Sequence, residues 1–488
     1  MKKHLISLLL TLCMALGLVT VSFAADKTVS SWGELTAAVS AAANQTAYIT
    51  LSCDITAAEG DGEITVPRLT TVKLDLNGHV LDGAGRTRVF LVEDGGRLTI
   101  TDSDAQRRGA VAGGSAENAG VAHNGGGVYV AEGGQLELNG ATIRDCYGGS
   151  GGGAVCTLGS FYMYNGAVIK DCTTWHAGGG GAVHTAGSKA QVVMRDTSVI
   201  ENCSFCGVWV EKGAFSMEGG TIRNCQARTG GGGVYISEEG TFTLSGGLIT
   251  GNYPGTNKGA IYLEGTLNLR GGEISDNTVD DMSAYWDDFV PYDAIFSKSS
   301  GVINCGGGIV KGGVHLQDNA QVNDDSFYGT TVFFDDVTGD RAIIRGGTYL
   351  GMCWGQIMVS DYSLNFHSGD PDKAYDYVAS ELVVGSSRPV KPSWLEGEWV
   401  TEDGEVFDFS QPLTKNTVIY PKADTGLQAD AGYQVDEDTD GGDTMAAGAL
   451  FRTTGSSAVG VTVLLALSLA GNVALIAALA RLKKKLGQ

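Results

Sequence analysis

The chain has 488 residues, of which 73 are glycine and only 8 are proline. This composition excludes collagen-like chains and proline-rich linkers, and it disfavours a helical bundle because glycine costs about 1 kcal/mol at each interior helix position. The formal charge of −22 argues against nucleic acid as a partner and against docking on anionic lipid through a basic face, while 43% hydrophobic residues are enough for a large core.

The first 24 residues have the pattern of a secretory signal. Lys2 and Lys3 precede an apolar stretch, and the stretch is followed by Ser22-Phe23-Ala24, which is a small-x-small cleavage pattern. We therefore assign residues 1–24 as a signal peptide and expect the rest of the chain to be exported.

The next segment predicts a helix that covers the start of the fold. Ser31–Glu34 has the Ser-x-x-Glu spacing of a capping box. Leu35, Val39 and Ala42 fall on one face of the helix that would follow. We assign residues 25–48 as an N-terminal cap, in which this amphipathic helix protects an open sheet edge.

A unit of about 26 residues repeats through the middle of the chain. Each copy has a glycine-rich or glycine-led start, then a short apolar strand, then two more short strands of alternating apolar and polar residues. The anchor residues of the first strands are spaced by 27, 28, 25, 26 and 27 positions. These anchors are Val128, Val155, Val183, Val208, Val234 and Ile261.

Such a unit cannot bury its apolar side chains alone, but a stack of units buries them all. Three short strands per unit and no helical period predict an all-β, right-handed parallel β-helix, which we assign to residues 49–365. Leucine-rich repeats and propeller blades are weaker alternatives, because their consensus residues or their length do not match. The glycine runs are expected at sharp corners, where coils approach closely and positive φ angles occur.

Each repeat ends with a small or polar residue followed by Cys or Asn, and stacking aligns these ends in a structural ladder at one corner. The ladder residues are Cys146, Cys172, Cys203, Cys225, Asn252 and Asn277. We expect free buried thiols, with disulfides between neighbouring coils as the alternative in an exported chain. We predict no metal site at these cysteines, because no Cys-x-x-Cys pair is backed by a second pair or by histidines.

The Gly-Gly-Ala/Val-Val runs and the Ile-x-x-Asn/Cys endings resemble the repeats of polymorphic outer-membrane proteins and, more broadly, the pectin-lyase-like right-handed parallel β-helix. The resemblance covers roughly residues 70–365. It implies a fold more than an activity, since binding modules, stalks and enzymes all use this scaffold. Enzymes on this fold usually act on acidic polysaccharides with carboxylates from neighbouring coils.

Two irregular segments are candidate ligand sites. Trp175 and His176 replace the short corner of the other units, and an exposed tryptophan can stack on a sugar face. A long acidic and aromatic insertion follows the last regular repeat, and long loops on rigid scaffolds often carry binding. Its candidate ligand-binding residues are Tyr285, Trp286, Asp287 and Asp288, and a calcium ion could be held at Asp280, Asp281, Asp287 and Asp288. Structural packing of Trp175, and an insertion that only wraps the solenoid, are the alternatives.

Aromatic residues recur at one strand position of the repeat. Tyr129, Trp209, Tyr235 and Tyr262 occupy the same strand position, which is structural if buried and a binding stripe if exposed. His184 follows an anchor residue and is expected to point outward.

The C-terminal part predicts four further segments, of which the first two precede the membrane. Residues 378–423 resemble the latter half of an internalin-type B repeat, a small β-grasp-like module of bacterial surface proteins, and we assign a small C-terminal β module to 366–423. Residues 424–457 are polar and acidic without period, which is typical of a flexible stalk.

Residues 458–480 carry no charge, and basic residues follow at once. At 1.5 Å per residue they would span about 34 Å, enough for the hydrocarbon core. We predict a single transmembrane helix there, with residues 481–488 as a cytoplasmic basic tail. A buried helix of a soluble domain is the alternative.

Together these patterns predict a single-pass protein of the cell membrane with most of its chain outside the cell. We expect an adhesin, that is, a β-helix that binds a glycan or a surface protein without catalysis. A surface-tethered polysaccharide lyase or glycoside hydrolase that acts on acidic polysaccharide is the alternative, and a purely structural spacer is a third. In each case we expect the C-terminal helix to insert into the membrane, which is therefore a partner of the protein.

Overall fold

The computed structural model describes residues 26–422 apart from several gaps. The gaps are 118–123, 176–178, 228–229, 256–258, 279–293, 318, 325–331, 345–347, 350–352, 360–361, 368–376, 384–387, 390, 392–394 and 396. The predicted signal, stalk, membrane helix and cytoplasmic tail lie outside these residues. In the described part of the chain, no helix has both the length and the hydropathy needed to cross a membrane.

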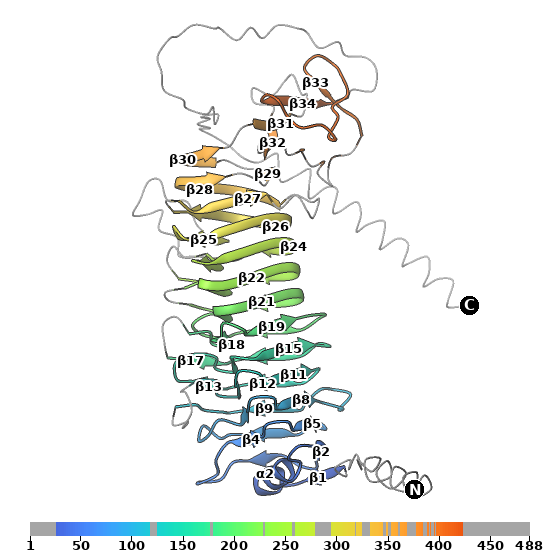
Figure 1. Cartoon of the computed structure of the whole chain (residues 1–488), viewed down its shortest axis with the longest axis vertical. Coiled ribbons are helices and arrows are strands. Elements are labelled where there is room, and N and C mark those ends of the chain that lie inside the picture. Colours follow the sequence, from blue (N-terminus) through green and yellow to red (C-terminus); the bar gives the residue numbers. More distant parts are fainter. Residues whose placement is uncertain are drawn as a thin grey trace, which may run out of the picture. The chain divides into compact units, whose positions relative to one another are not determined.

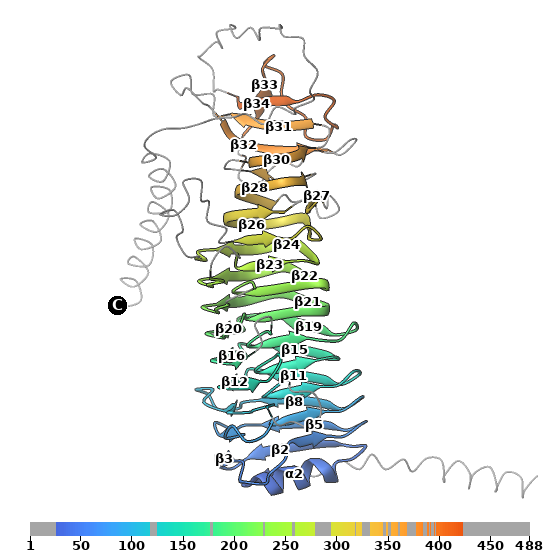
Figure 2. The same ribbon diagram turned by 90° about the vertical axis from the view of Figure 1, so that its left-hand side faces the viewer.

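The strands stack coil upon coil, and each coil contributes to three parallel faces (Figures 1 and 2). Face A contains β4 (Ile64–Val66), β7 (Phe90–Val92), β10 (Val128–Val130), β14 (Val155–Thr157), β18 (Val183–Thr185), β23 (Ile261–Leu263) and β25 (Ile295–Ser297). Face B contains β1 (Lys27–Val29), β2 (Thr46–Leu51), β5 (Thr71–Asp75), β8 (Arg97–Thr101), β11 (Gln135–Asn139), β15 (Ser160–Tyr164), β19 (Gln191–Met194) and β27 (Gln321–Asp324). Face C contains β3 (Ile55–Thr56), β6 (Val80–Asp82), β9 (Ala110–Ala112), β12 (Thr142–Arg144), β16 (Val168–Lys170), β20 (Val199–Glu201) and β29 (Thr348–Tyr349).

Later coils turn their corners without a break in the strand, so one strand serves more than one face. These strands are β21 (Val208–Arg223), β22 (Val234–Thr250), β24 (Thr266–Ser275), β26 (Val302–Leu316), β28 (Val332–Ile344) and β30 (Cys353–Val359). A short fourth pair, β13 (Tyr147–Gly148) and β17 (Thr173–Thr174), follows face C in two coils.

The strand register confirms the predicted repeat. The six anchor residues pair with one another in sequence order along face A, and all are fully buried. They belong to one continuous core that extends from Val29 to Val322. Stacking therefore buries the apolar positions that a single unit would leave exposed.

The residue before each ladder position adopts a left-handed backbone conformation. Their φ angles lie between 53° and 62°, at Asp145, Asp171, Asn202, Asn224, Gly251 and Asp276. Asp, Asn and Gly are the residue types that tolerate this conformation best. The small or polar residue that recurs before each Cys or Asn is therefore explained by the corner geometry. Close packing between coils explains other corner glycines, because a Cβ at Gly153 would collide with the carbonyl oxygen of Gly181.

Helix α2 (Trp32–Ala41) lies against β1, β2 and β4 at the N-terminal end of the stack (Figure 2). The Ser31 hydroxyl accepts a hydrogen bond from the Glu34 N–H at 3.3 Å. The Glu34 carboxylate accepts the backbone N–H of Ser30 at 2.8 Å, so the return bond of the predicted capping box goes to the residue before the N-cap. Leu35 and Val39 are fully buried, as an amphipathic cap requires.

A small mixed sheet follows the solenoid. β31 (Tyr362–His367) pairs antiparallel with β32 (Tyr377–Val383) and parallel with β34 (Thr417–Pro421), and β33 (Trp399–Thr401) pairs antiparallel with β34. It has a core of its own, and it begins at Tyr362, just before the boundary expected at 366. β32 also pairs with β29 of the solenoid, which links the two sheets.

Candidate functional site

The middle residue of each face A strand forms a column that we call the outward column. Its members pair in register from coil to coil and are Leu91, Tyr129, Cys156, His184, Trp209, Tyr235, Tyr262, Phe296 and His315. Because side chains alternate along a strand, these residues point away from the core that their neighbours fill. The sequence placed four of the aromatic members in one column, and the register confirms that alignment.

The aromatic part of the column is a stack. The rings of His184 and Trp209 lie parallel, with centroids 4.1 Å apart, and Trp209 is followed by Tyr235 at 6.1 Å. Tyr235 and Tyr262 meet edge to face at 5.2 Å, and Tyr262 and Phe296 lie parallel again at 5.5 Å. Tyr262 and Phe296 are buried, whereas Trp209 and Tyr235 remain half-buried. The stack is therefore mainly structural, with two rings that retain some exposed surface.

His184 points away from the core, as expected, but it is buried. A Cβ built at Gly151 would lie 2.6 Å from its Nδ1, which shows how closely the backbone of the preceding corner covers the ring. The alternation of side chains along a strand predicts whether a side chain points toward the core or away from it. It does not predict whether the backbone of a neighbouring corner covers that side chain.

His184 connects a thiol to a carboxylate. Its Nδ1 lies 3.7 Å from the Cys156 Sγ, and its Nε2 lies 2.8 Å from the Glu211 Oε2. The hydrogen bond from His184 lowers the pKa of Glu211. Burial raises the pKa of the Cys156 thiol to about 12. The thiol is therefore protonated near neutral pH, and this Cys-His-Glu array lacks the ionised, accessible sulfur that nucleophilic catalysis requires.

The start of the column is held by a buried arginine. The Arg88 guanidinium pairs with Glu63 at 2.8 Å and donates to the carbonyl oxygens of Asn124 and Gly125 at 2.9 and 3.1 Å. It also lies over the Tyr129 ring, 5.0 Å from the centroid. Arg88 therefore fixes both the glycine-rich corner and the tyrosine.

A groove lies at the corner between faces A and B, beside Tyr129. We call it the A–B groove, and its lining residues are Arg68, Leu91, Glu93, Asp94, Tyr129, Ala131, Glu132 and Leu158. An apolar floor is thus bordered by three carboxylates and one guanidinium. The groove was not expected from the sequence, although acidic residues recur one or two positions after the face A segments, at Glu93, Glu132, Glu211 and Glu264.

The predicted ligand residues are only partly described. Trp175 is 67% exposed and precedes β18, whereas the A–B groove residues follow β7, β10 and β14, so the two lie at opposite ends of the face A strands. His176 and the insertion residues Tyr285, Trp286, Asp287 and Asp288 lie outside the described residues, as do Asp280 and Asp281. Binding at these positions remains a prediction.

The corner ladder is a column of buried thiols and amides. Each of its four thiols donates to the carbonyl oxygen two residues earlier, at 3.2 to 3.4 Å, and all four cysteines are free. Asn252 and Asn277 make the same bond at 3.1 Å and add bonds to the neighbouring coil. Burial is the main cause that raises the pKa of Cys172. In the described segments, no group of three or more His, Cys, Asp or Glu side chains is arranged to hold a metal ion.

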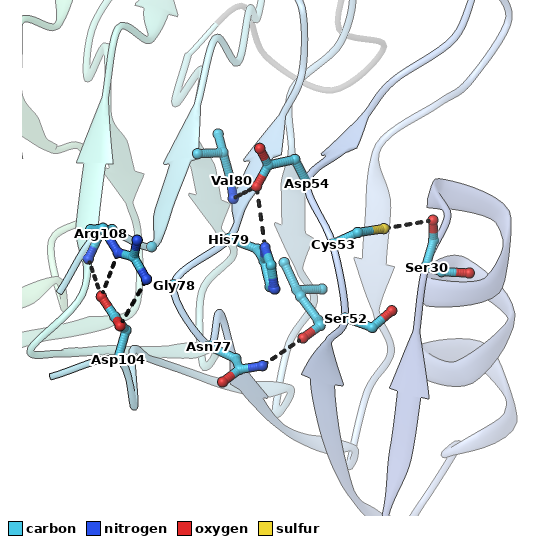
Figure 3. Close-up of polar contacts among 12 residues, drawn as sticks. Ser30, Ser52, Cys53, Asp54, Asn77, Gly78, His79, Val80, Asp104 and Arg108 are labelled. Carbon is cyan, nitrogen blue, oxygen red and sulfur yellow. Dashed lines mark hydrogen bonds and ion pairs between the residues drawn. The ribbon is translucent and has the colours of Figure 1, made fainter. Parts of the chain in front are cut away.

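A second histidine lies near the N-terminal end of the stack. Figure 3 shows His79 beside Asp54, with 3.4 Å between Nδ1 and Oδ1, while the same carboxylate oxygen accepts the Val80 N–H at 3.0 Å. Asn77 donates to the carbonyl oxygen of Leu51 at 3.1 Å in the same corner. These contacts connect neighbouring coils, so we assign this cluster a structural role.

Comparison with known protein families identifies the fold family of the chain. The family model described as the right-handed β-helix region matches residues 89–266 and 161–348. No curated protein and no solved structure matches the chain.

Proposed function

Since the chain belongs to the right-handed β-helix family, whose model covers more than half of it, we propose that it is a binding protein of the cell surface. In this proposal the solenoid displays a rigid surface that holds a glycan or a surface protein and leaves it chemically unchanged. The proposed signal peptide and membrane helix, residues 1–24 and 458–480, would export the chain and retain it at the membrane.

The A–B groove is the observation that carries this proposal. Ligand sites are typically concave, with an apolar lining and a few polar groups that orient the ligand. The groove is shallow and open, and it combines the half-buried Leu91, Ala131 and Leu158 in its floor with the exposed Glu93 and Glu132 at its border. The flanking strands are paired on both sides, so the groove is built on a rigid part of the fold.

The charge of the groove disfavours the enzymatic alternative. Three carboxylates against one guanidinium give the lining a formal charge of 1 − 3 = −2, Lys189 beside Glu132 reduces this to −2 + 1 = −1, and the whole chain carries −22. A negative site repels the acidic polysaccharides on which enzymes of this fold usually act. The buried Cys156 thiol offers no alternative nucleophile, because its raised pKa keeps it protonated.

The test uses the full chain in detergent micelles, applied to an array of neutral, acidic and amino-sugar glycans and of extracellular matrix proteins. The same preparation is incubated with uronic-acid polymers and neutral polysaccharides while new reducing ends and unsaturated products are measured. We expect saturable binding to at least one class of ligand and no product. Cleavage of a polymer, or no binding to any array component, would contradict the proposal.

The location is tested separately. We expect an antibody against the β-helix to label intact cells of the source organism, and we expect the protein to sediment with the membrane fraction. Release of the protein into the medium by high salt alone would argue against a membrane helix.

A further inference from the structure

The A–B groove crosses several coils. Arg68 precedes β5, Leu91, Glu93 and Asp94 belong to the coil of β7, Tyr129, Ala131 and Glu132 to the coil of β10, and Leu158 to the coil of β14. Neighbouring coils are about 4.8 Å apart, so the lining extends over about 14 Å along the stack. An extended chain molecule fits such a groove better than a compact one.

The floor favours a ligand with an apolar face. Leu91 and Tyr129 pair in register on adjacent strands, and Ala131 and Leu158 continue the surface at the following corner. Tyr129 is only 8% exposed and has Arg88 over its ring, so it supports the floor from beneath, and the accessible apolar surface comes mainly from Leu91, Ala131 and Leu158. The apolar C–H face of a sugar ring is a suitable partner for such a surface.

The border favours a ligand with positive charge. Asp94 pairs with Arg68 at 3.3 Å and Glu132 pairs with Lys189 at 2.9 Å, and all four side chains are at least 60% exposed. Exposed pairs of this kind contribute only about 0 to 1 kcal/mol, so a cationic ligand can replace them at little cost. Glu93 adds a third carboxylate, which accepts the Arg68 N–H at 3.1 Å.

We propose that the A–B groove binds a glycan chain with free amino groups, such as a polymer of glucosamine, with its sugar rings over the apolar floor and its ammonium groups beside Glu93, Asp94 and Glu132. This inference rests on the proposed binding function and names its ligand class. Charge complementarity decides between ligands of similar shape, because the same floor would accept an N-acetylated or an acidic sugar while the border would not favour them.

The test measures the affinity of the full chain in detergent for three oligosaccharides of equal length: glucosamine oligomers, N-acetylglucosamine oligomers and oligogalacturonate. We expect the glucosamine oligomers to bind at least about tenfold tighter than the other two, and we expect this preference to shrink as salt is raised. Equal or tighter binding of the N-acetylated or the acidic oligomer would overturn the proposal.

A matched pair of variants locates the site. Glu132 and Glu239 are 65% and 66% exposed, and each pairs with a lysine, at 2.9 and 3.0 Å, but only Glu132 lines the groove. We expect Glu132→Gln to weaken glucosamine binding about fivefold, equivalent to one exposed ion pair of about 1 kcal/mol, and Glu239→Gln to leave it unchanged. Equal effects of the two variants would overturn the assignment of the groove.

A third variant, Leu158→Arg, introduces a positive charge into the floor and should abolish glucosamine binding, with circular dichroism as the check that the fold persists. If glycan binding is detected on the array but none of these groove variants changes it, the inference fails while the proposed binding function stands. If the array shows no ligand of any class, both fail.

Discussion

The buried corner ladder shows how one position accepts two different side chains. Asn252 accepts the Cys225 N–H at 3.0 Å and donates to the carbonyl oxygens of Ile222 and Thr250 at 3.0 and 3.1 Å. A cysteine in the same place keeps the last of these bonds, as Cys225 does to Arg223 at 3.4 Å, and its sulfur also interacts with the ladder cysteine of the neighbouring coil, as Cys225 does with Cys203. The amide adds a donated bond to the Ile222 carbonyl oxygen of the adjacent coil.

This difference predicts an order of stability at position 252. Asn252→Ala should lower the free energy of unfolding by about 3 kcal/mol, because buried backbone groups lose their partners, and each such loss costs about 1 to 3 kcal/mol. Asn252→Cys should cost less, since the thiol retains one bond. Urea denaturation of the wild type and the two variants measures the order, and equal midpoints for the wild type and Asn252→Ala would show that the amide bonds contribute nothing.

The pair of His184 and Glu211 predicts a dependence on pH. The folded-state pKa of Glu211 is lowered, so its ionised form stabilises the fold above the unfolded pKa of about 4.5, and this contribution is lost as the pH falls through the folded value. We expect the melting temperature of the wild type to exceed that of Glu211→Gln near pH 6, and we expect the gap to narrow as the pH falls below 4.5 and to close once Glu211 is protonated in the folded state. Glu239→Gln is the control, and a gap that does not depend on pH would contradict the prediction.

Among the secondary-structure elements, α2 has the clearest separate role. It lies against β1, β2 and β4, and it buries Leu35 in the core at the end of the stack. Without such a cover, the first coil would present unpaired strand edges and an open core to other chains. The Ser-x-x-Glu spacing and the apolar face were sufficient to predict this helix, because capping and amphipathicity are local properties.

Two separate aspartate substitutions, one on the buried side and one on the exposed side of the helix, test the role of the cap. We expect Leu35→Asp to lower the melting temperature and to produce oligomers, because it places a carboxylate at a fully buried position and loosens the helix from the stack. Ala37→Asp, on the exposed side of the helix, should leave the protein monodisperse. Size-exclusion chromatography with light scattering measures both, and a monodisperse Leu35→Asp variant with unchanged stability would contradict the proposed role.

For the chain as a whole, the repeat spacing was enough to predict the parallel β-helix and the alignment of the anchor residues and the corner ladder. The reason is that each stacked position recurs once per coil, so a periodic pattern along the chain becomes a column in space. The glycine runs and the Asp or Asn before each ladder residue follow from corner geometry for the same reason.

The contacts between residues of adjacent coils at the corners could not be predicted from the repeat spacing. The burial of His184, its contact with Glu211 and the A–B groove depend on which residues of adjacent coils meet at a corner, and corner lengths vary from one coil to the next. Trp175 illustrates the same limit, since its exposure depends on the corner it follows rather than on its place in the repeat. The repeating pattern thus specified the columns, whereas the shapes of the irregular corners specified which side chains are covered, which are paired and where the surface is hollow.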